Sequence, residues 1–219
     1  SYKKYYEDNL AEFYTHANLD SVPDNQPEPE DFYWNNGYFP RGDARSLYAF
    51  VSSTAPGTFL EIGVGNSTRI ARKAITDFGL KTKIKSIDPA PRANITRFSD
   101  EVIKDSVTNV DLDTFRALKS GDILFIDGSH VCQVGTDLPF FFLNVFPVLS
   151  KGVIIHVHDI FLPWEYYERM RVRHYNEQHL LGGMLINSDH WDILLPVHYA
   201  QQTGIIKHGG GSMWFKKNK

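Results

Sequence analysis

Two short groups of acidic and imidazole side chains each follow an apolar run. Asp127 and His130 follow one run, and His158 and Asp159 follow another. An imidazole with an ordinary pKa of about 6.5 is mostly neutral at cellular pH, so His130 or His158 can act as a general base toward a hydroxyl. Alternatively, Asp127, His158 and Asp159 can hold a divalent metal ion that lowers the pKa of the hydroxyl. Asp127, His130 and His158 are therefore the candidate catalytic residues.

Nearby polar residues have simpler interpretations. Alternation along a strand places His156 and His158 on one face and Asp159 on the other, so the chain must bend there to present all three. We interpret His156, inside the apolar run, as a hydrogen-bonded core residue. The dinuclear hydrolase pattern HxHxDH fails, because Asp159 follows His158 directly. No sequence feature activates Cys132, which we expect to be a packed thiol.

A glycine turn separates a third apolar run from a helical stretch, in the order Glu61-Ile-Gly63-Val-Gly65-Asn-Ser-Thr68. Glycines let the backbone pass close to a ligand, and the following helix N-terminus offers free amides. The nicotinamide fingerprint GxGxxG fails, because Thr68 stands at its third glycine. The acidic Glu61 favours a ligand with a cationic or amino-acid end. Asp88 ends the next apolar run, where a carboxylate can accept both hydrogen bonds of a ribose diol.

Short apolar runs rich in β-branched residues alternate with helical stretches. This order predicts parallel strands buried on both faces, with right-handed crossover helices on both sides of the sheet. Ligands in such folds bind beyond the carboxyl ends of the strands. The predicted strands are residues 58–63, 84–88, 101–104, 123–127 and 153–158, with a closing pair at 191–197 and 212–216. Apolar helical faces are predicted over residues 70–78 and 141–149, and a charged helical stretch continues to about residue 185.

The N-terminal region has a different composition. Tyr2, Tyr6, Phe13 and neighbouring apolar residues recur at a helical period, which predicts an amphipathic helix that docks on the body. Residues 20–31 are acidic and contain Pro23, Pro27 and Pro29, as expected of an extended linker. We therefore divide the chain into residues 1–31 and a main domain of residues 32–219. Because the sequence begins at Ser1, it is compatible with a domain of a longer chain.

Composition excludes several classes of protein. The chain has 219 residues, a net charge of −3 and 42% hydrophobic residues, as in a globular protein. A single cysteine excludes an internal disulfide framework and a cysteine-built zinc site, and it predicts a reducing, cytoplasmic compartment. No apolar run approaches the roughly 18 residues of a membrane span. The near-neutral charge argues against nucleic acid as the partner and favours a small molecule.

Four motifs together resemble the class I S-adenosylmethionine (SAM)-dependent methyltransferases. They are FLEIGVGNSTRIA, SIDPAPRANI, GDILFIDGSHV and VIIHVHDIFLPWEY, in the family's order and spacing. The IDGSH and HVHDI pair and the closing GGGSMWF resemble methyltransferase family 24, many of whose members serve polysaccharide or glycoside biosynthesis. The resemblance implies an α/β Rossmann-like fold, with a seven-stranded, mostly parallel sheet whose last strand is antiparallel.

The resemblance also implies where the cofactor SAM binds. The glycine turn underlies the methionine part, Asp88 holds the ribose, and Asp105 and Ser106 border the adenine. His158 stands where the family often has a carboxylate, so a softer transition metal, or no metal, is expected in place of a hard ion. The predicted cofactor residues are Glu61, Gly63, Gly65, Asn66, Ser67, Thr68, Asp88, Asp105, Ser106 and Asp127.

We therefore expect a SAM-dependent O-methyltransferase. Aromatic and polar residues at 34–39 and in a cap segment at 160–187 are placed to cover the strand ends, and they suit a glycan or other small hydroxyl acceptor. One alternative is a nicotinamide-dependent sugar oxidoreductase, disfavoured by Thr68 and by the lack of a Tyr-x-x-x-Lys pair after residue 127. Another is a methyltransferase-like domain that only binds ligands.

Overall fold

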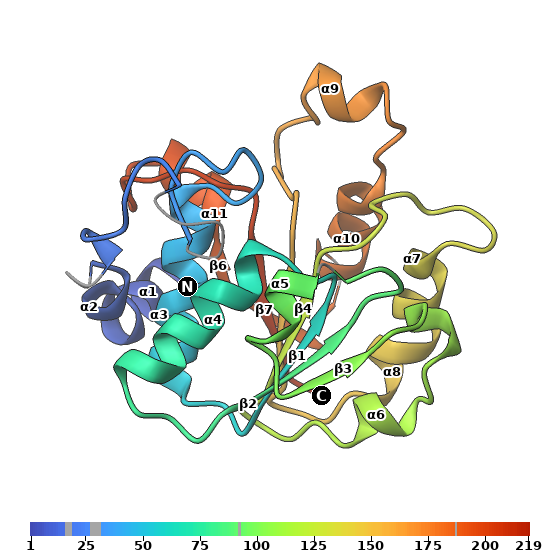
Figure 1. Ribbon diagram of the computed structural model, residues 1–219. Coiled ribbons are helices and arrows are strands. Elements are labelled where there is room, and N and C mark those ends of the chain that lie inside the picture. Colours follow the sequence, from blue (N-terminus) through green and yellow to red (C-terminus); the bar gives the residue numbers. More distant parts are fainter. Residues whose placement is uncertain (16–18, 27–31, 92, 187) are drawn as a thin grey trace.

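The computed structural model describes residues 1–15, 19–26, 32–91, 93–186 and 188–219. The predicted linker residues Pro27 and Pro29 lie outside the described residues. In the described chain, helices cover both faces of a central sheet (Figure 1).

The sheet has seven strands in the order β3-β2-β1-β4-β5-β7-β6. β1 to β5 run parallel, and β7 pairs antiparallel with both β5 and β6. The predicted Rossmann-like methyltransferase sheet is confirmed, and each predicted strand lies within two residues of an observed one. The strands are β1 (Thr58–Ile62), β2 (Lys83–Ile87), β3 (Glu101–Ile103), β4 (Ile123–Ile126), β5 (Ile154–Val157), β6 (Trp191–Pro196) and β7 (Met213–Lys217).

The strand order reverses between β1 and β4, which is the point where ligands bind in this class of fold. Backbone hydrogen bonds continue past the strand ends here. The amide of Asp127 donates to Ile62 at 3.1 Å, and the amide of His158 donates to Ile126 at 3.0 Å. The first residues after β1, β4 and β5 therefore lie side by side.

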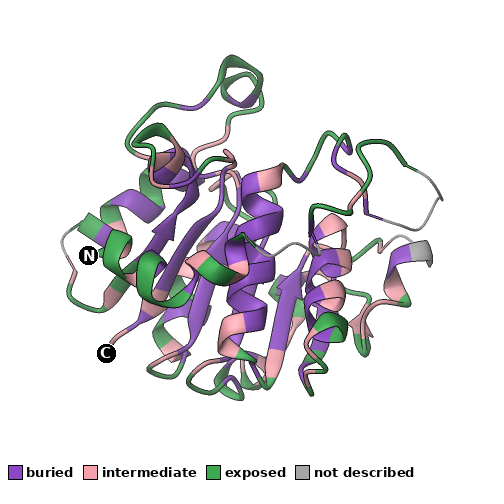
Figure 2. Ribbon diagram, turned by 90° about the vertical axis from the view of Figure 1, so that its left-hand side faces the viewer, coloured by how far each residue is buried: buried purple, intermediate pink, exposed green. Residues whose placement is uncertain are grey.

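Two apolar cores fill the two faces of the sheet. Figure 2 shows that most of the strands between them are buried. Alternate residues of a strand enter different cores: Phe59 and Phe125 face one, and Leu60 and Leu124 face the other. The first core is covered by α1 (Tyr2–Asn9), α2 (Ala11–Tyr14), α3 (Arg41–Thr54) and α4 (Asn66–Asp77). The second is covered by α6 (Asp113–Arg116), α7 (Asp137–Phe140), a π-helical turn (Phe141–Val145), α8 (Phe146–Val148) and α10 (Glu177–Ile186).

Helix α3 is a core element that the sequence analysis did not predict. Its residues 42–52 are all buried, because α2 and α4 pack against α3. Tyr6, Leu10 and Tyr14 of the N-terminal segment enter the same core. The predicted docking of the N-terminal helix is thus observed, in two pieces.

The charged helical stretch predicted to continue to about residue 185 is not one continuous helix. It consists of α9 (Glu168–Arg171) and α10, joined by a non-helical link, and α9 stands above the sheet in Figure 1. The remaining short elements are α5 (Ala93–Thr96), a 3₁₀ turn (Val107–Asn109) and α11 (Val197–Gln202). Among the described residues, no helix is long and apolar enough to cross a membrane.

Candidate active site

The glycine turn after β1 touches the end of β4. Gly63 has φ +85°, and a Cβ there would collide with the carbonyl oxygen of Asp127, so only glycine fits. Around Gly65, in contrast, no heavy atom of the described residues, its own chain neighbours apart, lies within 4 Å of the Cβ position. The turn therefore closes against β4 on one side and leaves open space on the other.

Glu61 braces this turn from inside the protein. Its carboxylate is fully buried and accepts hydrogen bonds from Ser67 (2.6 Å), Thr68 (2.7 Å) and Ser86 (3.2 Å). The Thr68 hydroxyl also accepts the amide of Gly65 at 3.1 Å. Burial raises the pKa of Glu61 to about 7, although the three hydroxyls oppose this rise. Glu61 and Thr68 line neither cavity described below, so they shape the turn from behind.

Asp88 organises the opposite wall. One carboxylate oxygen accepts the amide of Val64 at 2.9 Å, and the other accepts the amide of Ala90 at 2.7 Å. The side chain thus ties the glycine turn to the loop after β2. Each oxygen retains a further lone pair, which suits the ribose contact predicted for Asp88.

Two adjoining cavities of about 180 and 380 Å³ lie at these strand ends, and both include Gly63, Asp88 and Asp127. The predicted residues Gly65, Asn66 and Ser67 line the smaller one, and Ser106 lines the larger one. Asp105 lines neither, because its carboxylate accepts the Ser106 amide and the Asn109 side chain. The larger cavity is also lined by residues outside the predicted cofactor set, among them Val107, Ser129, Thr136 and Asp137.

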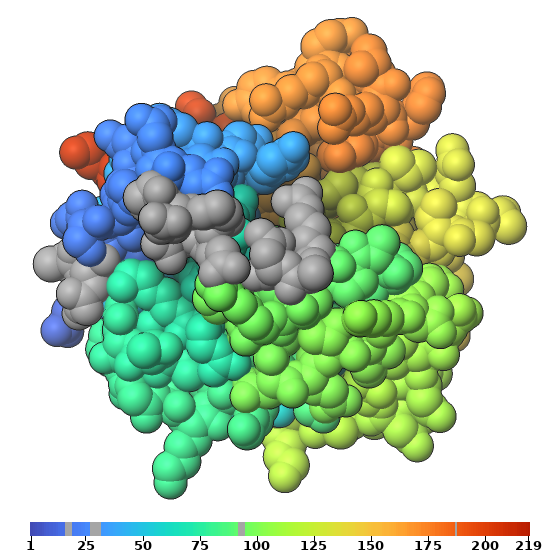
Figure 3. All heavy atoms as spheres, in the orientation of Figure 1, coloured from blue at the N-terminus to red at the C-terminus, as the bar shows by residue number. Residues whose placement is uncertain are grey.

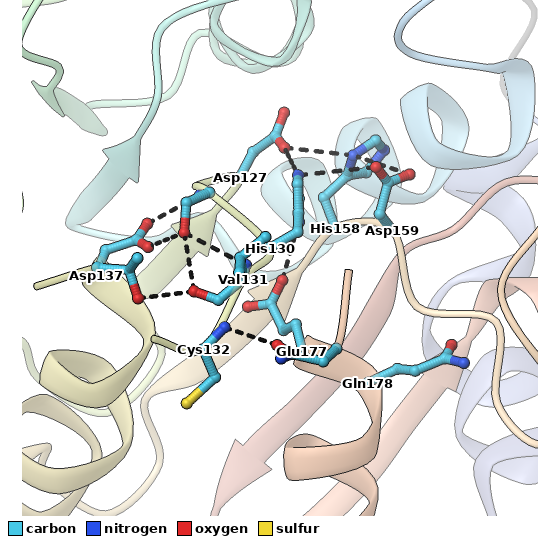
Figure 4. A network of polar contacts seen from close by, with 12 residues as sticks. Asp127, His130, Val131, Cys132, Asp137, His158, Asp159, Glu177 and Gln178 are labelled. Carbon is cyan, nitrogen blue, oxygen red and sulfur yellow. Dashed lines mark hydrogen bonds and ion pairs between the residues drawn. The ribbon is translucent and has the colours of Figure 1, made fainter. Parts of the chain in front are cut away.

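A cluster of imidazoles and carboxylates lies at the ends of β4 and β5 (Figure 4). His130 (φ +59°) and Asp159 (φ +57°) both have left-handed backbone conformations. The turn at Asp159 is the bend needed to present this carboxylate together with His158. The structure therefore brings together all four residues predicted at these strand ends.

The inner nitrogens of both imidazoles face the same two carboxylates. His130 Nε2 lies 3.2 Å from Asp127 Oδ1 and 3.7 Å from Asp159 Oδ2. His158 Nδ1 lies 3.5 Å from Asp127 Oδ1 and 3.7 Å from Asp159 Oδ1. One oxygen of Asp127 thus contacts both rings, as the dashed lines in Figure 4 show.

The outer nitrogens contact two carboxylates that the sequence analysis missed. His130 Nδ1 lies 2.9 Å from Glu177 Oε2, at the start of α10. His158 Nε2 lies 3.0 Å from Asp43 Oδ2, in the first turn of α3. Both carboxylates are buried. No local motif marks either residue, since each reaches the site only through tertiary packing.

The buried charges determine the protonation of this cluster. Burial alone would lower the pKa of both imidazoles, but Asp127, with Glu177 at His130 and Asp43 at His158, raises the pKa of each well above its usual value. Burial alone would raise the pKa of Asp127, but the two imidazoles hold it well below its usual range. A cluster of four carboxylates and two imidazoles therefore favours bound positive charge.

His156 is a core residue, as expected. Its side chain is fully buried, it stacks on Phe125 at 3.8 Å between ring centroids, and its Nε2 lies 2.7 Å from the hydroxyl of Ser212. Burial and the neighbouring His158 hold the pKa of His156 well below its usual value. This residue therefore packs behind the cluster as a neutral ring.

A third cavity, of about 580 Å³, opens on the other side of the cluster, where His158 and Asp159 form part of its wall. The predicted segments at 34–39 and 160–187 both contribute to it, and Figure 3 shows the blue N-terminal and orange cap surfaces next to each other at this end of the molecule. Its aromatic residues are Trp34, Tyr38, Phe39, Phe161 and Tyr167, and its polar residues include Asn35, Arg169, His198, Gln201 and Gln202.

Sequence comparison agrees with the motifs. Residues 60–160 match methyltransferase family 24, which is described as a methyltransferase domain. An uncharacterized protein of Archaeoglobus fulgidus is 34% identical over 98 residues, which are 42% of this chain and 44% of that protein. The match thus spans less than half of that relative.

Solved methyltransferases share the fold at low sequence identity. The SAH-bound methyltransferase PaMTH1 of Podospora anserina superposes with a TM-score of 0.55 and 15% identity, covering 99% of this chain and 93% of that one. MycE methyltransferase of the mycinamycin biosynthetic pathway, in complex with Mg, SAH and mycinamycin VI, superposes with a TM-score of 0.51 and 16% identity. This match covers 86% of this chain and 52% of that one. The chain has the class I methyltransferase fold, and the predicted family resemblance is confirmed.

Proposed function

We propose that this protein is a SAM-dependent O-methyltransferase whose acceptor is a hydroxyl of a small molecule, a sugar of a glycan or glycoside. One observation carries the proposal: the cluster of Asp127, His130, His158 and Asp159 lies between two kinds of cavity. Asp127 lines the two cavities at the glycine turn, and His158 and Asp159 line the cavity under the cap. A methyl donor on one side and a hydroxyl on the other would meet at this cluster.

The cavities at the glycine turn suit SAM. Gly65 leaves room beside the turn, and Asp88 has carboxylate lone pairs for a ribose diol. Ser106 and Val107 lie in the larger cavity, where the adenine would bind. When bound, SAM supplies an electrophilic sulfonium methyl group. PaMTH1 and MycE, which share this fold, were both solved with SAH.

On the acceptor side, the cluster has a proton acceptor for the hydroxyl. His130 Nε2 and His158 Nδ1 both face the centre of the site. Because the surrounding carboxylates raise the pKa of both rings, a ring must first release the proton of its inner nitrogen, and the neutral ring then takes the hydroxyl proton as the oxygen attacks. Asp127, between the rings, stabilises the imidazolium that forms. Aromatic walls and amide tips in the 580 Å³ cavity suit a sugar, which has an apolar ring face and hydroxyl groups.

A divalent metal is the second way to activate the hydroxyl, and Asp127, His158 and Asp159 would hold it. The carboxylate oxygens lie 3.5 to 3.7 Å from His158 Nδ1, so a small shift would bring the donor atoms around one ion. Among the described residues, no three such side chains already form a metal-binding group. When bound, the metal would lower the pKa of the hydroxyl. The imidazole ligand favours a transition metal over Mg²⁺, the ion in the MycE complex.

Calorimetry with SAM, SAH and NAD tests the cofactor. We expect binding of SAM and SAH and none of NAD, whereas NAD binding without SAM binding would overturn the proposal. Transfer of a labelled methyl group from SAM to a panel of glycan precursors tests the reaction. If SAM binds but none of the hydroxyl acceptors is methylated, with or without Mn²⁺ or Mg²⁺, the domain serves as a binding module and the enzymatic proposal is wrong.

A further inference from the structure

We propose that Glu177 and Asp43 are positioning residues, which hold the imidazoles of His130 and His158 with their inner nitrogens toward the reaction centre. This inference rests on the proposed function, because it assigns a role at the same site. It concerns two residues on α10 and α3, outside the strand ends that carry the cluster.

The two imidazoles present opposite ring nitrogens to the centre. His130 offers Nε2 and bonds outward through Nδ1, whereas His158 offers Nδ1 and bonds outward through Nε2. An ionised carboxylate can only accept a hydrogen bond, so a ring nitrogen that bonds one carries a proton. The outer contacts, at 2.9 and 3.0 Å, are shorter than the inner ones, at 3.2 to 3.7 Å, so a ring that loses one proton keeps the outer one. When a ring is neutral, its lone pair is then on the inner nitrogen, where it can receive a proton or bind a metal.

Helix α10 and the residues before it hold His130 by more than the Glu177 carboxylate. The amide of Asn176 donates to the carbonyl of His130 at 3.1 Å, and the Asn176 side chain accepts the amide of Cys132 at 2.6 Å. The ring of Tyr175 lies 4.7 Å from the His130 ring. These contacts fix the left-handed turn at His130, and the Glu177 carboxylate fixes the rotation and the proton of the ring.

Asp43 is even more tightly held. Besides His158, its carboxylate accepts the amides of Gly211 (2.9 Å) and Ser212 (2.8 Å), and a Cβ at Gly210 would collide with it. Substitution of Asp43 would therefore disturb the loop before β7 as well as the imidazole. In the part of the chain that the structure describes, the Glu177 side chain hydrogen-bonds His130 alone, so Glu177 is the better residue to test.

The test is a double-mutant cycle with E177Q and H130Q. E177Q keeps the size of the side chain but lets the amide donate to Nδ1, which places the proton on the inner nitrogen. We expect kcat to fall on the order of 100-fold, with KM for SAM and acceptor nearly unchanged. In the H130Q background, E177Q should change kcat by less than about 3-fold, because Glu177 acts through His130. E177D, which keeps a carboxylate, should recover part of the activity.

Equal losses from E177Q in both backgrounds would overturn the inference, and so would full activity of E177Q. E101Q is the matched control, because Glu101 is exposed on β3 and pairs with Lys85 far from the site. A second measurement does not require turnover: ¹⁵N NMR should show an exchange-protected Nδ1–H of His130 that is absent in H130Q and lost in E177A. If this signal is present and no acceptor is methylated, the proposed function fails and the positioning geometry stands; if the signal survives in E177A, the inference fails.

Discussion

At the scale of single residues, Asp127 connects the parts of the site. Its carboxylate lies within 3.5 Å of both imidazoles, and the residue also lines both cavities at the glycine turn. A substitution of Asp127 would therefore disturb donor binding and proton transfer together. His130 separates these effects better, because it lines neither of those cavities.

We predict that H130Q lowers kcat by about 10²- to 10⁴-fold, the usual contribution of a general acid or base. SAM affinity should stay within about 2-fold, since the turn at Gly63 and Asp88 is untouched. H190Q is the matched control, because His190 is exposed and its ring pairs with Ser188 and Asp189 beside β6. Steady-state kinetics and calorimetry measure the two effects. If H130Q keeps its activity, the base is His158 and not His130.

The buried carboxyl group of Glu61 should make the free energy of unfolding depend on pH. Its pKa is about 7 in the folded protein and near the ordinary 4.5 in the unfolded chain, so the folded state binds the extra proton between these values. The stability that this proton provides is complete below about pH 4.5 and is lost as the pH rises to about 7, a change on the order of 3 kcal/mol. E61Q should remove this component. Urea unfolding of both proteins without cofactor, from about pH 5 to 8, should show a steeper decline for the wild type; parallel declines would contradict the assignment.

At the scale of elements, the turn between β1 and α4 depends on close contact with β4. We predict that G63A destabilises the protein by about 2–5 kcal/mol, from the left-handed backbone and the collision with the Asp127 carbonyl. G79A is the matched control, because Gly79 has φ +59° and open space around its Cβ position. Only the backbone cost, about 1–2 kcal/mol, applies to G79A. Chemical denaturation gives both values, and equal losses would show that the contact with β4 does not matter.

The pattern of each helix and strand also determines which parts of the site could be predicted from the sequence. Glu61, Asp88, Asp127 and His158 lie at or next to the ends of strands that carry short local patterns, and the parallel order of these strands brings their ends together. The charged helical stretch expected to continue to about residue 185 is interrupted, because apolar spacing does not reveal the non-helical link between α9 and α10. Asp43 and Glu177 could not be found, since each pairs with a histidine far away in the sequence.

At the scale of the whole molecule, the N-terminal segment supports the site through α3. α2 packs on α3, α1 packs on α2 and β6, and the first turn of α3 carries Asp43. From composition, we placed residues 1–31 outside the main domain. An aromatic stripe and an acidic linker do not show in the sequence which surface they cover. The structure shows that Tyr6, Leu10 and Tyr14 belong to the same core as β1 and β4.

We therefore predict that a change in this segment lowers the stability of the entire fold. Leu10 is fully buried, so L10A should reduce the free energy of unfolding by about 2–5 kcal/mol. L143A is the matched control, because the Leu143 side chain is 74% exposed. Its free energy of unfolding should stay within about 0.5 kcal/mol of the wild-type value.

Denaturation followed by far-UV circular dichroism and by tryptophan fluorescence should give one shifted transition in L10A, since Trp214 packs in the same core as Leu10. Both probes report the same transition only if the N-terminal helices and the sheet unfold together. A separate early transition, with the main one unshifted, would show instead that residues 1–15 unfold on their own. Because Leu10 and Trp214 share one core, we expect the N-terminal segment and the sheet to unfold together.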